Sequence, residues 1–332
     1  MVIVARVERF FTRKLTMKAL FILYIASTFL GLFWIGFNFN NNVPQNSSKE
    51  DIAFLTKRLI ELEKSEEHLK SLIKSKETNN EDLPIIFVVT PTHSRLEQKA
   101  ELTRLCQCFM HVPKLHWIVV EDRESRSRLV ENFLSKCKVV SSHLFVKTPD
   151  ESVLKANESR WKKPRGVQQR NVALSYLRFE HSRSKGVVFF ADDDNVYDLE
   201  LFNEMRHTQK ASVWPVGLVG KLKYETPVLD SQGKVIFWRT AWKGTRKFAL
   251  DMAGFAVNLK LITDSPKVQF RSGRSIGMLE TNFLSDLNLE LSDLEPKANG
   301  CTQVLVWHTR TEKPVIKNEG KMLKIPVDQR EV

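Results

Sequence analysis

The segment GVVFFADDDN, residues 186–195, joins an apolar run to three consecutive aspartates, Asp192, Asp193 and Asp194. A run that is apolar throughout is typical of a strand buried on both faces of a parallel sheet. Adjacent carboxylates repel one another, so their position at the end of such a strand predicts a bound cation. Mg²⁺ and Mn²⁺ take oxygen ligands, commonly one or two carboxylates together with substrate phosphates. The alternative is an acidic turn that caps the following helix, which requires one such residue rather than three.

Three more apolar runs precede this segment, and stretches with helical spacing separate the runs. The expected strands are IIFVVTPT (85–92), LHWIVVED (115–122) and HLFVKTP (143–149). The expected helices lie within residues 94–112, 125–137 and 166–179. This alternation predicts a doubly wound α/β sheet, in which ligands bind beyond the carboxyl ends of the strands. Polar residues stand at those ends: Thr92, His93, Glu121 and Asp122.

The region after residue 205 has a different pattern. Residues 212–242 predict short strands joined by turns, with one turn at the sequence DSQG, residues 230–233. A helix is expected around residues 277–287, and a last strand within TQVLVWHTRT, residues 302–311. Because no linker interrupts the chain between residue 84 and about residue 320, we expect one continuous unit over residues 84–332.

The amino-terminal residues carry a membrane-targeting pattern. The run Ala19–Phe37 has no charged residue, and its length approaches the roughly 20 residues that span a bilayer. Lysines and arginines precede it and none follows directly, which predicts a single-pass anchor with residues 1–18 in the cytosol and the remainder in a lumen. A cleaved signal peptide is the alternative, but the run is long for a signal core and lacks a small-x-small cleavage site.

Residues 38–83 predict a stem. Apolar residues recur there at alternating steps of three and four, with Glu66 interrupting one position: Ile52, Leu55, Leu59, Leu62, Leu69 and Ile73. About three heptads of this kind predict a coiled coil that pairs two chains. A single amphipathic helix or a partly disordered stalk also fits so short a repeat.

The composition narrows the class of partner. The net charge of +12 suits nucleic acid, a membrane surface or anionic small molecules. Nucleic acid is the least favoured, because the sequence has no zinc-finger spacing, aromatic RNA-binding signature or long basic helix. Cys106 and Cys108 follow the apolar pattern of their segment, which favours buried free thiols. Asn46 and Asn157 stand in glycosylation sequons.

Cationic residues before the aspartates predict an anionic ligand. The segment ESRWKKPRGVQQRN, residues 158–171, contains Arg165 and Arg170 among five basic residues. Arginine offers a planar fork for a phosphate or a sugar carboxylate, although a solvated basic loop is the alternative. His308 and Arg310, just past the last expected strand, could face the same anion. Glu280 is a candidate general base that composition does not separate from Glu225 or Glu295.

Several long segments together resemble the β-1,3-glucuronosyltransferases of the Golgi, which build the proteoglycan linkage region and glucuronyl epitopes of glycoproteins. The resemblance runs from about Pro84 to Gly320, and its segments include VVTPT, QKAELTRL, PRGVQQRN, FADDDN, DMAGFAVNL and VLVWHTRTEKPV. It implies the nucleotide-sugar-binding A-type glycosyltransferase fold, a Rossmann-like mixed sheet flanked by helices. It also implies UDP-glucuronate as donor, Mn²⁺ as cofactor, a Golgi membrane anchor and a homodimer.

The resemblance assigns roles to the candidate residues. Asp194 would be the metal ligand, with Asp192 near the donor sugar and Asp193 in the same donor-binding motif. Asp122 would hydrogen-bond the uracil and His93 would stack on it, while the diphosphate and glucuronate would be held by Arg165, Arg170, His308 and Arg310. Glu280 would be the catalytic base. The acceptor site would contain Glu225, Arg246 and Asp251.

The implied reaction inverts the anomeric carbon as the acceptor hydroxyl attacks in line with departing UDP. The favoured acceptor is the terminal galactose of the Gal-Gal-Xyl linkage region. The alternatives are another galactoside such as Gal-GlcNAc and a non-catalytic sugar-binding Golgi protein. His93 departs from the tyrosine of family members, and the tail after Gly320 matches no family segment, so the acceptor and the affinity for UDP remain open.

Overall fold

The computed structural model describes residues 27–32, 54–67, 82–153, 163–242, 246–271 and 277–317, together with residues 70, 158 and 244. Residues 1–77 and 78–332 form two separate compact units. In the first unit, residues 27–32 and 54–67 are helical, and the second of these lies inside the predicted stem. No helix in the described part of the chain is long and apolar enough to cross a membrane.

The second unit is built on a seven-stranded mixed sheet with the strand order β11-β6-β10-β4-β1-β2-β3. The parallel strands are β1 (Ile85–Thr92), β2 (Leu115–Glu121), β3 (Val140–Phe145) and β4 (Gly186–Phe190). On the far side of β4, β10 (Phe255–Asn258) runs antiparallel to its neighbours β4 and β6 (Ala211–Val213), and β11 (Leu294–Pro296) closes the sheet. The four expected parallel strands are therefore confirmed.

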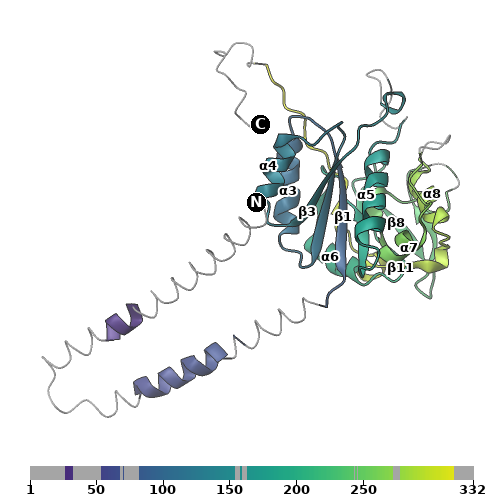
Figure 1. Ribbon diagram of the computed structural model, residues 1–332. Coiled ribbons are helices and arrows are strands. Elements are labelled where there is room, and N and C mark those ends of the chain that lie inside the picture. The colour runs from purple at the N-terminus through teal and green to yellow at the C-terminus, as the bar shows by residue number, and fades with distance from the viewer. Residues whose placement is uncertain are drawn as a thin grey trace, which may run out of the picture. The chain divides into compact units, whose positions relative to one another are not determined.

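Helices cover both faces of this sheet (Figure 1). One face carries α3 (Gln98–Phe109), α4 (Arg128–Lys136) and α6 (Leu199–Arg206), and the other carries α5 (Val167–Glu180), α7 (Leu259–Asp264) and α8 (Leu279–Asp286). Alternate residues of each strand enter opposite cores: Val88 packs with α3, whereas Phe87 and Val89 pack with α5. Both faces of the sheet are buried, which explains why the strand sequences are apolar throughout.

The edge strand β3 differs from the prediction. It begins at Val140, three residues before the expected run, and ends at Phe145. Both end residues are exposed, because β3 has a neighbour on one side only. Thr148 lies beyond the strand, where its side chain can reach the carboxyl end of β2.

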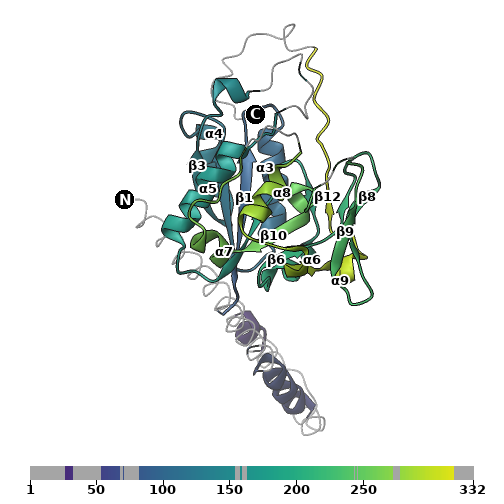
Figure 2. The ribbon, with the colours of Figure 1, turned by 90° about the vertical axis from the view of Figure 1, so that its right-hand side faces the viewer.

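A second, five-stranded sheet accounts for the short strands expected after residue 205. Figure 2 shows β8, β9 and β12 together at one side of the unit. The strand order is β5 (Val196–Tyr197), β12 (Val306–Trp307), β7 (Val216–Gly217), β8 (Tyr224–Leu229) and β9 (Val235–Arg239). The turn at residues 230–233 joins β8 to β9, with Gly233 at a positive φ of 78°. The last strand, β12, is much shorter than expected because Thr309 turns back to donate its N–H to the carbonyl of Trp307.

Short elements complete the unit. The 3₁₀ turns are η1 (Asp150–Ser152), η2 (Met252–Gly254) and η3 (Leu291–Asp293), and a last helical turn is α9 (Ala298–Cys301).

The expectation of a free thiol at Cys106 is wrong. Cys106 in α3 forms a disulfide with Cys137 at the end of α4, with 6.2 Å between the Cα atoms. The two helices lie on the same face of the sheet, and their packing brings together residues 31 positions apart. The spacing of apolar residues correctly predicted that Cys106 is buried, but it contained no information on its disulfide partner. Cys108 and Cys301 are free and partly buried.

Candidate active site

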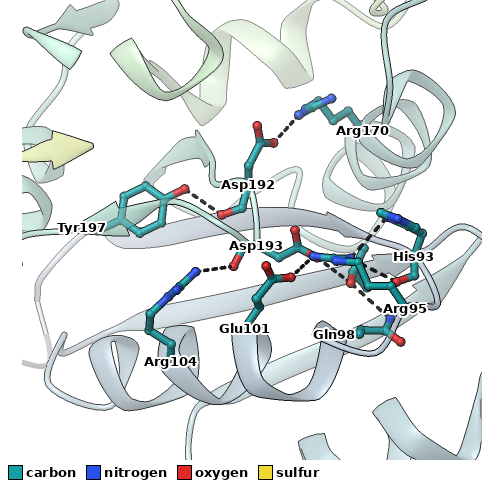
Figure 3. A network of polar contacts seen from close by, with 10 residues as sticks. His93, Arg95, Gln98, Glu101, Arg104, Arg170, Asp192, Asp193 and Tyr197 are labelled. Carbon is teal, nitrogen blue, oxygen red and sulfur yellow. Dashed lines mark hydrogen bonds and ion pairs between the residues drawn. The ribbon is translucent and has the colours of Figure 1, made fainter. Parts of the chain in front are cut away.

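The triple aspartate lies at the carboxyl edge of the parallel strands. Thr92, the last residue of β1, pairs with Glu121 of β2, and β4 ends beside β1 two residues before Asp192. The backbone continues in register, since Ala191 donates its N–H to the carbonyl of Val89. The strand ends therefore bring residues from three distant segments into one polar network (Figure 3).

Asp192 is held by the arginine of the predicted anion-binding segment. Arg170, in the first turns of α5, places Nη2 2.6 Å from Asp192 Oδ1 and is almost fully buried. Its Nη1 donates to the carbonyl of Arg165 at 2.8 Å. The two arginines predicted to bind an anion are therefore in direct contact. Gly166, with a φ of 72°, begins the helix, and a Cβ there would lie 2.6 Å from Arg170 Nη1. This turn therefore requires glycine.

Asp193 points to the other side of the loop and is nearly buried. Its Oδ2 accepts a hydrogen bond of 2.7 Å from Thr92 Oγ1 and lies 2.7 Å from Arg95 Nη2. The same Arg95 nitrogen also pairs with Glu101 of α3. Arg104, one turn further along α3, donates to the backbone carbonyl of Asp193 at 3.3 Å.

Asp194 keeps its carboxylate free of such partners. Thr309 Oγ1 donates to its backbone carbonyl at 2.6 Å, but no described residue donates a hydrogen bond to its side chain. Burial and the charges of Asp192 and Asp193 raise its pKa. The described residues contain no group of three His, Cys, Asp or Glu side chains placed to hold a metal. One uncompensated carboxylate nevertheless fits a divalent cation whose remaining ligands are substrate phosphates and water.

The second sheet brings His308 to the same edge. Strand β12 pairs with β5, directly after the aspartates, and His308 donates its N–H to the carbonyl of Gly217 at 2.9 Å. Its Nδ1 lies 3.5 Å from Asp251 Oδ2, and that carboxylate raises the pKa of His308. Burial alone raises the pKa of Asp251, but His308 and the N–H of Ala253 outweigh burial and lower it.

Glu280 lies in the first turn of α8, close enough to this cluster to interact with it electrostatically. Burial, together with the negative charge of Asp251, raises its pKa to about 7, against the opposing effects of Arg246 and Arg170. A carboxylate with such a pKa exchanges a proton near neutral pH, as a general base must. The other two candidate bases, Glu225 and Glu295, both accept hydrogen bonds from neighbouring groups of the fold. Glu295 on β11 accepts the N–H groups of Gln209 and Lys210.

Glu225 and Arg246 lie on the side of the second sheet. Glu225 Oε1 accepts hydrogen bonds from Thr240 Oγ1 and the N–H of Ala241, at 2.8 and 2.9 Å. Arg246 Nη1 donates to the carbonyl of Gly277 at 2.7 Å, and its guanidinium lies 4.8 Å from the ring centre of Trp242. Arg246 and Trp242 also line an open groove of about 550 Å³ beside β9.

The remaining candidates divide into three groups. Asp122 accepts 2.6 and 2.7 Å hydrogen bonds from the N–H and Oγ1 of Thr148, and His93 contacts Arg95. Arg165 and Arg310 have exposed side chains. Asn46 and Asn157 lie outside the described residues.

The structure corrects the role of one expected residue and adds two residues that were not predicted. Glu121, expected at the ligand edge, instead is fully buried and accepts hydrogen bonds from Ser127 and from His143. Arg95 and Glu101 were missed. A signal existed, because Glu101 lies on the apolar stripe of its helix beside Leu102 and Leu105, where a charge needs a partner. The identity of that partner is not contained in the spacing.

Comparisons with known proteins agree on one family. The model of glycosyltransferase family 43 matches residues 105–312. Galactosylgalactosylxylosylprotein 3-beta-glucuronosyltransferase 2 of Homo sapiens is 52% identical over 246 residues, covering 72% of this chain and 73% of that protein. Galactosylgalactosylxylosylprotein 3-beta-glucuronosyltransferase 1 of Homo sapiens is 51% identical over 246 residues, covering 73% of each chain.

Among solved structures, S. aureus TarS residues 1–349 align with a TM-score of 0.42 and 14% identity, over 68% of this chain and 60% of that one. So distant a likeness does not bear on the assignment. The assignment rests on the family model, whose match includes the aspartate loop and Glu280, and on the relatives that are more than 50% identical. The chain belongs to glycosyltransferase family 43.

Proposed function

We propose that this chain transfers glucuronate from UDP-glucuronate to a terminal galactose in β1-3 linkage, with inversion at the anomeric carbon. The names of its relatives, at 51–52% identity, support this activity and favour the Gal-Gal-Xyl linkage region as acceptor. The observation that carries the chemistry is Glu280, whose pKa of about 7 suits proton transfer near neutral pH.

Glu280 would act as the base. It would accept the proton of the acceptor hydroxyl as that oxygen attacks the anomeric carbon. Asp251 contributes indirectly, because its charge raises the pKa of Glu280 while it favours the imidazolium of His308. These groups therefore have separate tasks, and their pKa values are shifted in the directions that those tasks require.

The cationic residues would receive the donor. His308, as an imidazolium, and Arg310 follow β12 on one side of the aspartate loop, and Arg165 and Arg170 open α5 on the other. UDP-glucuronate carries negative charge on its diphosphate and on its sugar carboxylate, and arginine forks suit both groups. Asp122 and His93, just past the ends of β2 and β1, would receive the base.

We assign Mn²⁺ to Asp194, with Asp192 and Asp193 as the neighbouring charges of the motif. A divalent metal there would neutralise charge on the leaving diphosphate. Asp192 and Asp193 are already paired with Arg170 and Arg95, so their carboxylates shape and orient the loop. That division leaves Asp194 as the carboxylate free to bind a cation.

We further propose a Golgi membrane location, with a single amino-terminal anchor and a lumenal catalytic unit, and a homodimer. The disulfide between Cys106 and Cys137 supports an oxidising compartment, because such bonds are rare in the cytosol. Cell-surface and permeabilised-cell labelling of an epitope at each terminus would test the topology. Labelling of the carboxyl terminus from the cytosol would contradict it.

One experiment tests the activity and separates the acceptors. The full-length chain in detergent is given UDP-glucuronate and Mn²⁺ with either a Gal-Gal-Xyl or a Gal-GlcNAc acceptor. We expect transfer to the first and less to the second, and transfer about 10²–10⁴-fold slower with Glu280→Gln. Transfer only to Gal-GlcNAc would favour the alternative acceptor. Binding of UDP with no transfer to either would favour a non-catalytic sugar-binding protein.

A further inference from the structure

Arg95 connects two parts of the site that the sequence does not relate. It lies in the segment between β1 and α3, and its side chain is 18% exposed. Its Nη2 pairs with Asp193 Oδ2 at 2.7 Å and with Glu101. Its Nη1 lies 3.2 Å from His93 Nδ1 and donates to the His93 carbonyl at 3.1 Å. One guanidinium therefore contacts the residue expected under the nucleotide base and an aspartate of the metal loop (Figure 3).

The charges around Arg95 make it difficult to replace. Asp193 and Glu101 have side chains that are 11% and 4% exposed, and both pair with the same guanidinium. Removal of Arg95 would leave two carboxylates, both largely buried, facing each other without that cation, which is a costly arrangement. Arg104 is not a substitute, because it contacts the backbone carbonyl of Asp193. Lysine keeps the charge but cannot offer the same fork to several acceptors.

A second chain of contacts reinforces the same aspartate. Gln98, in the first turn of α3, donates to Thr92 Oγ1 at 3.2 Å, and Thr92 donates to Asp193 Oδ2 at 2.7 Å. With Arg95 on the same oxygen, Asp193 is committed to the end of β1 and to α3. Its neighbour Asp194 therefore takes its position from these contacts and from Thr309.

We propose that Arg95 is a positioning residue that couples the base-binding side of the site, through His93, to the metal-binding side, through Asp193. This inference rests on the proposed function, which supplies UDP and Mn²⁺ as the two ligands. Each ligand orders one end of the Arg95 connection, so each increases the affinity for the other by the same factor. The imidazole acceptor at His93 strengthens the connection in this chain.

The coupling is measured as the ratio of the Kd for UDP without and with Mn²⁺, by calorimetry on the full-length chain. Arg95→Lys should lower that ratio by about fivefold or more, the low end of common coupling energies. Arg183→Lys, at an exposed arginine at the opposite end of the sheet, is the matched control and should leave the ratio unchanged. His93→Phe keeps an aromatic ring but removes the acceptor nitrogen, and should also lower the ratio. The double variant Arg95→Lys, His93→Phe should lower it no further, because both changes break the same contact.

A measurement without ligand separates this inference from the proposed function. In hydrogen exchange, Arg95→Lys should accelerate both residues 92–95 and residues 191–195, whereas Arg183→Lys should accelerate neither. An unchanged UDP ratio, or acceleration confined to one of the two segments, would overturn the role of Arg95. Failure of the wild-type chain to bind UDP would instead overturn the proposed function. The exchange experiment would still test whether Arg95 connects His93 to Asp193.

Discussion

Two carboxylates of the site have raised pKa values, and their neighbours explain both. Burial is the largest cause for Glu280 and for Asp194. The second cause is another carboxylate in each case: Asp251 beside Glu280, and Asp192 beside Asp194. A raised pKa means that the ionised form is disfavoured, so each group gains when it accepts a proton or a cation. Glu280 is suited to the first and Asp194 to the second.

The pH dependence of transfer should follow Glu280. Its pKa of about 7 means that the fraction of ionised base falls as the pH is lowered through 7, so kcat/KM should fall with it. Glu280→Gln should lower kcat by about 10²–10⁴-fold and remove this step from the profile. The Kd for UDP should stay close to that of the wild type. A variant that keeps most of its activity would show that Glu280 is not the base.

Asp194→Asn should separate metal binding from the fold. The amide keeps the size of the side chain but removes the charge that a divalent cation requires. We expect loss of Mn²⁺ binding, followed by electron paramagnetic resonance, and loss of transfer at any Mn²⁺ concentration. The melting temperature should not fall, since the carboxylate has no hydrogen-bond partner among the described residues. Asp264→Asn, at an exposed residue at the end of α7, is the control, and wild-type Mn²⁺ affinity in Asp194→Asn would contradict the assignment.

At the scale of elements, α3 contributes most to the shape of the site. Its buried face packs on the sheet through Leu102, Leu105 and Phe109, and its polar residues Glu101 and Arg104 reach the aspartate loop. The disulfide at Cys106 lies on the same helix and ties it to the end of α4. A displacement of α3 would therefore move the contacts of Asp193.

Removal of the disulfide should destabilise the catalytic unit. For residues 31 positions apart, chain entropy predicts a loss of about 3–4 kcal/mol in the free energy of unfolding. Cys106→Ala combined with Cys137→Ala should show this loss in denaturant unfolding. Cys108→Ala removes a thiol from the same helix with the disulfide intact, and should cost less. Equal losses in the two variants would indicate that packing, rather than the cross-link, stabilises this face.

At the scale of the whole unit, neutral histidines limit its stability in acid. His116 on β2 has a pKa lowered to about 4 by burial and by nearby His181, whose ring centre is 5.0 Å away. Because the pKa of an unfolded histidine is about 6.5, the unfolded chain binds this proton first. The stabilisation is complete above pH 6.5 and is lost as the pH falls toward 4.

The melting temperature of the wild type should therefore decrease between pH 6.5 and 4. His116→Gln removes the titrating group while it keeps a polar side chain near Ser142, its present partner at 2.8 Å. This variant should be less sensitive to pH over that range, even if it is less stable at neutral pH. His111→Gln, at an exposed histidine, is the control. Parallel curves for wild type and His116→Gln would contradict the prediction.

The sequence alone determined the main sheet and the edge at which the site lies. The strands are apolar throughout because both faces are buried, and helical spacing between them forces parallel pairing. These patterns repeat over a few neighbouring residues, so they can be recognised in the sequence without knowledge of the fold. The same logic placed Asp192–Asp194, His93 and Asp122 at one edge, as the structure confirms.

The tertiary structure decided what depends on contacts between distant segments. Thr92 and Asp193 are 101 residues apart, Cys106 and Cys137 are 31 apart, and no periodicity relates either pair. The resemblance alone had named Glu280 as the base, but the physical reason, its raised pKa, depends on the fold, because a pKa is set by burial and by neighbouring charges. Sequence patterns report which residues are buried, whereas the fold alone reports which residues they meet.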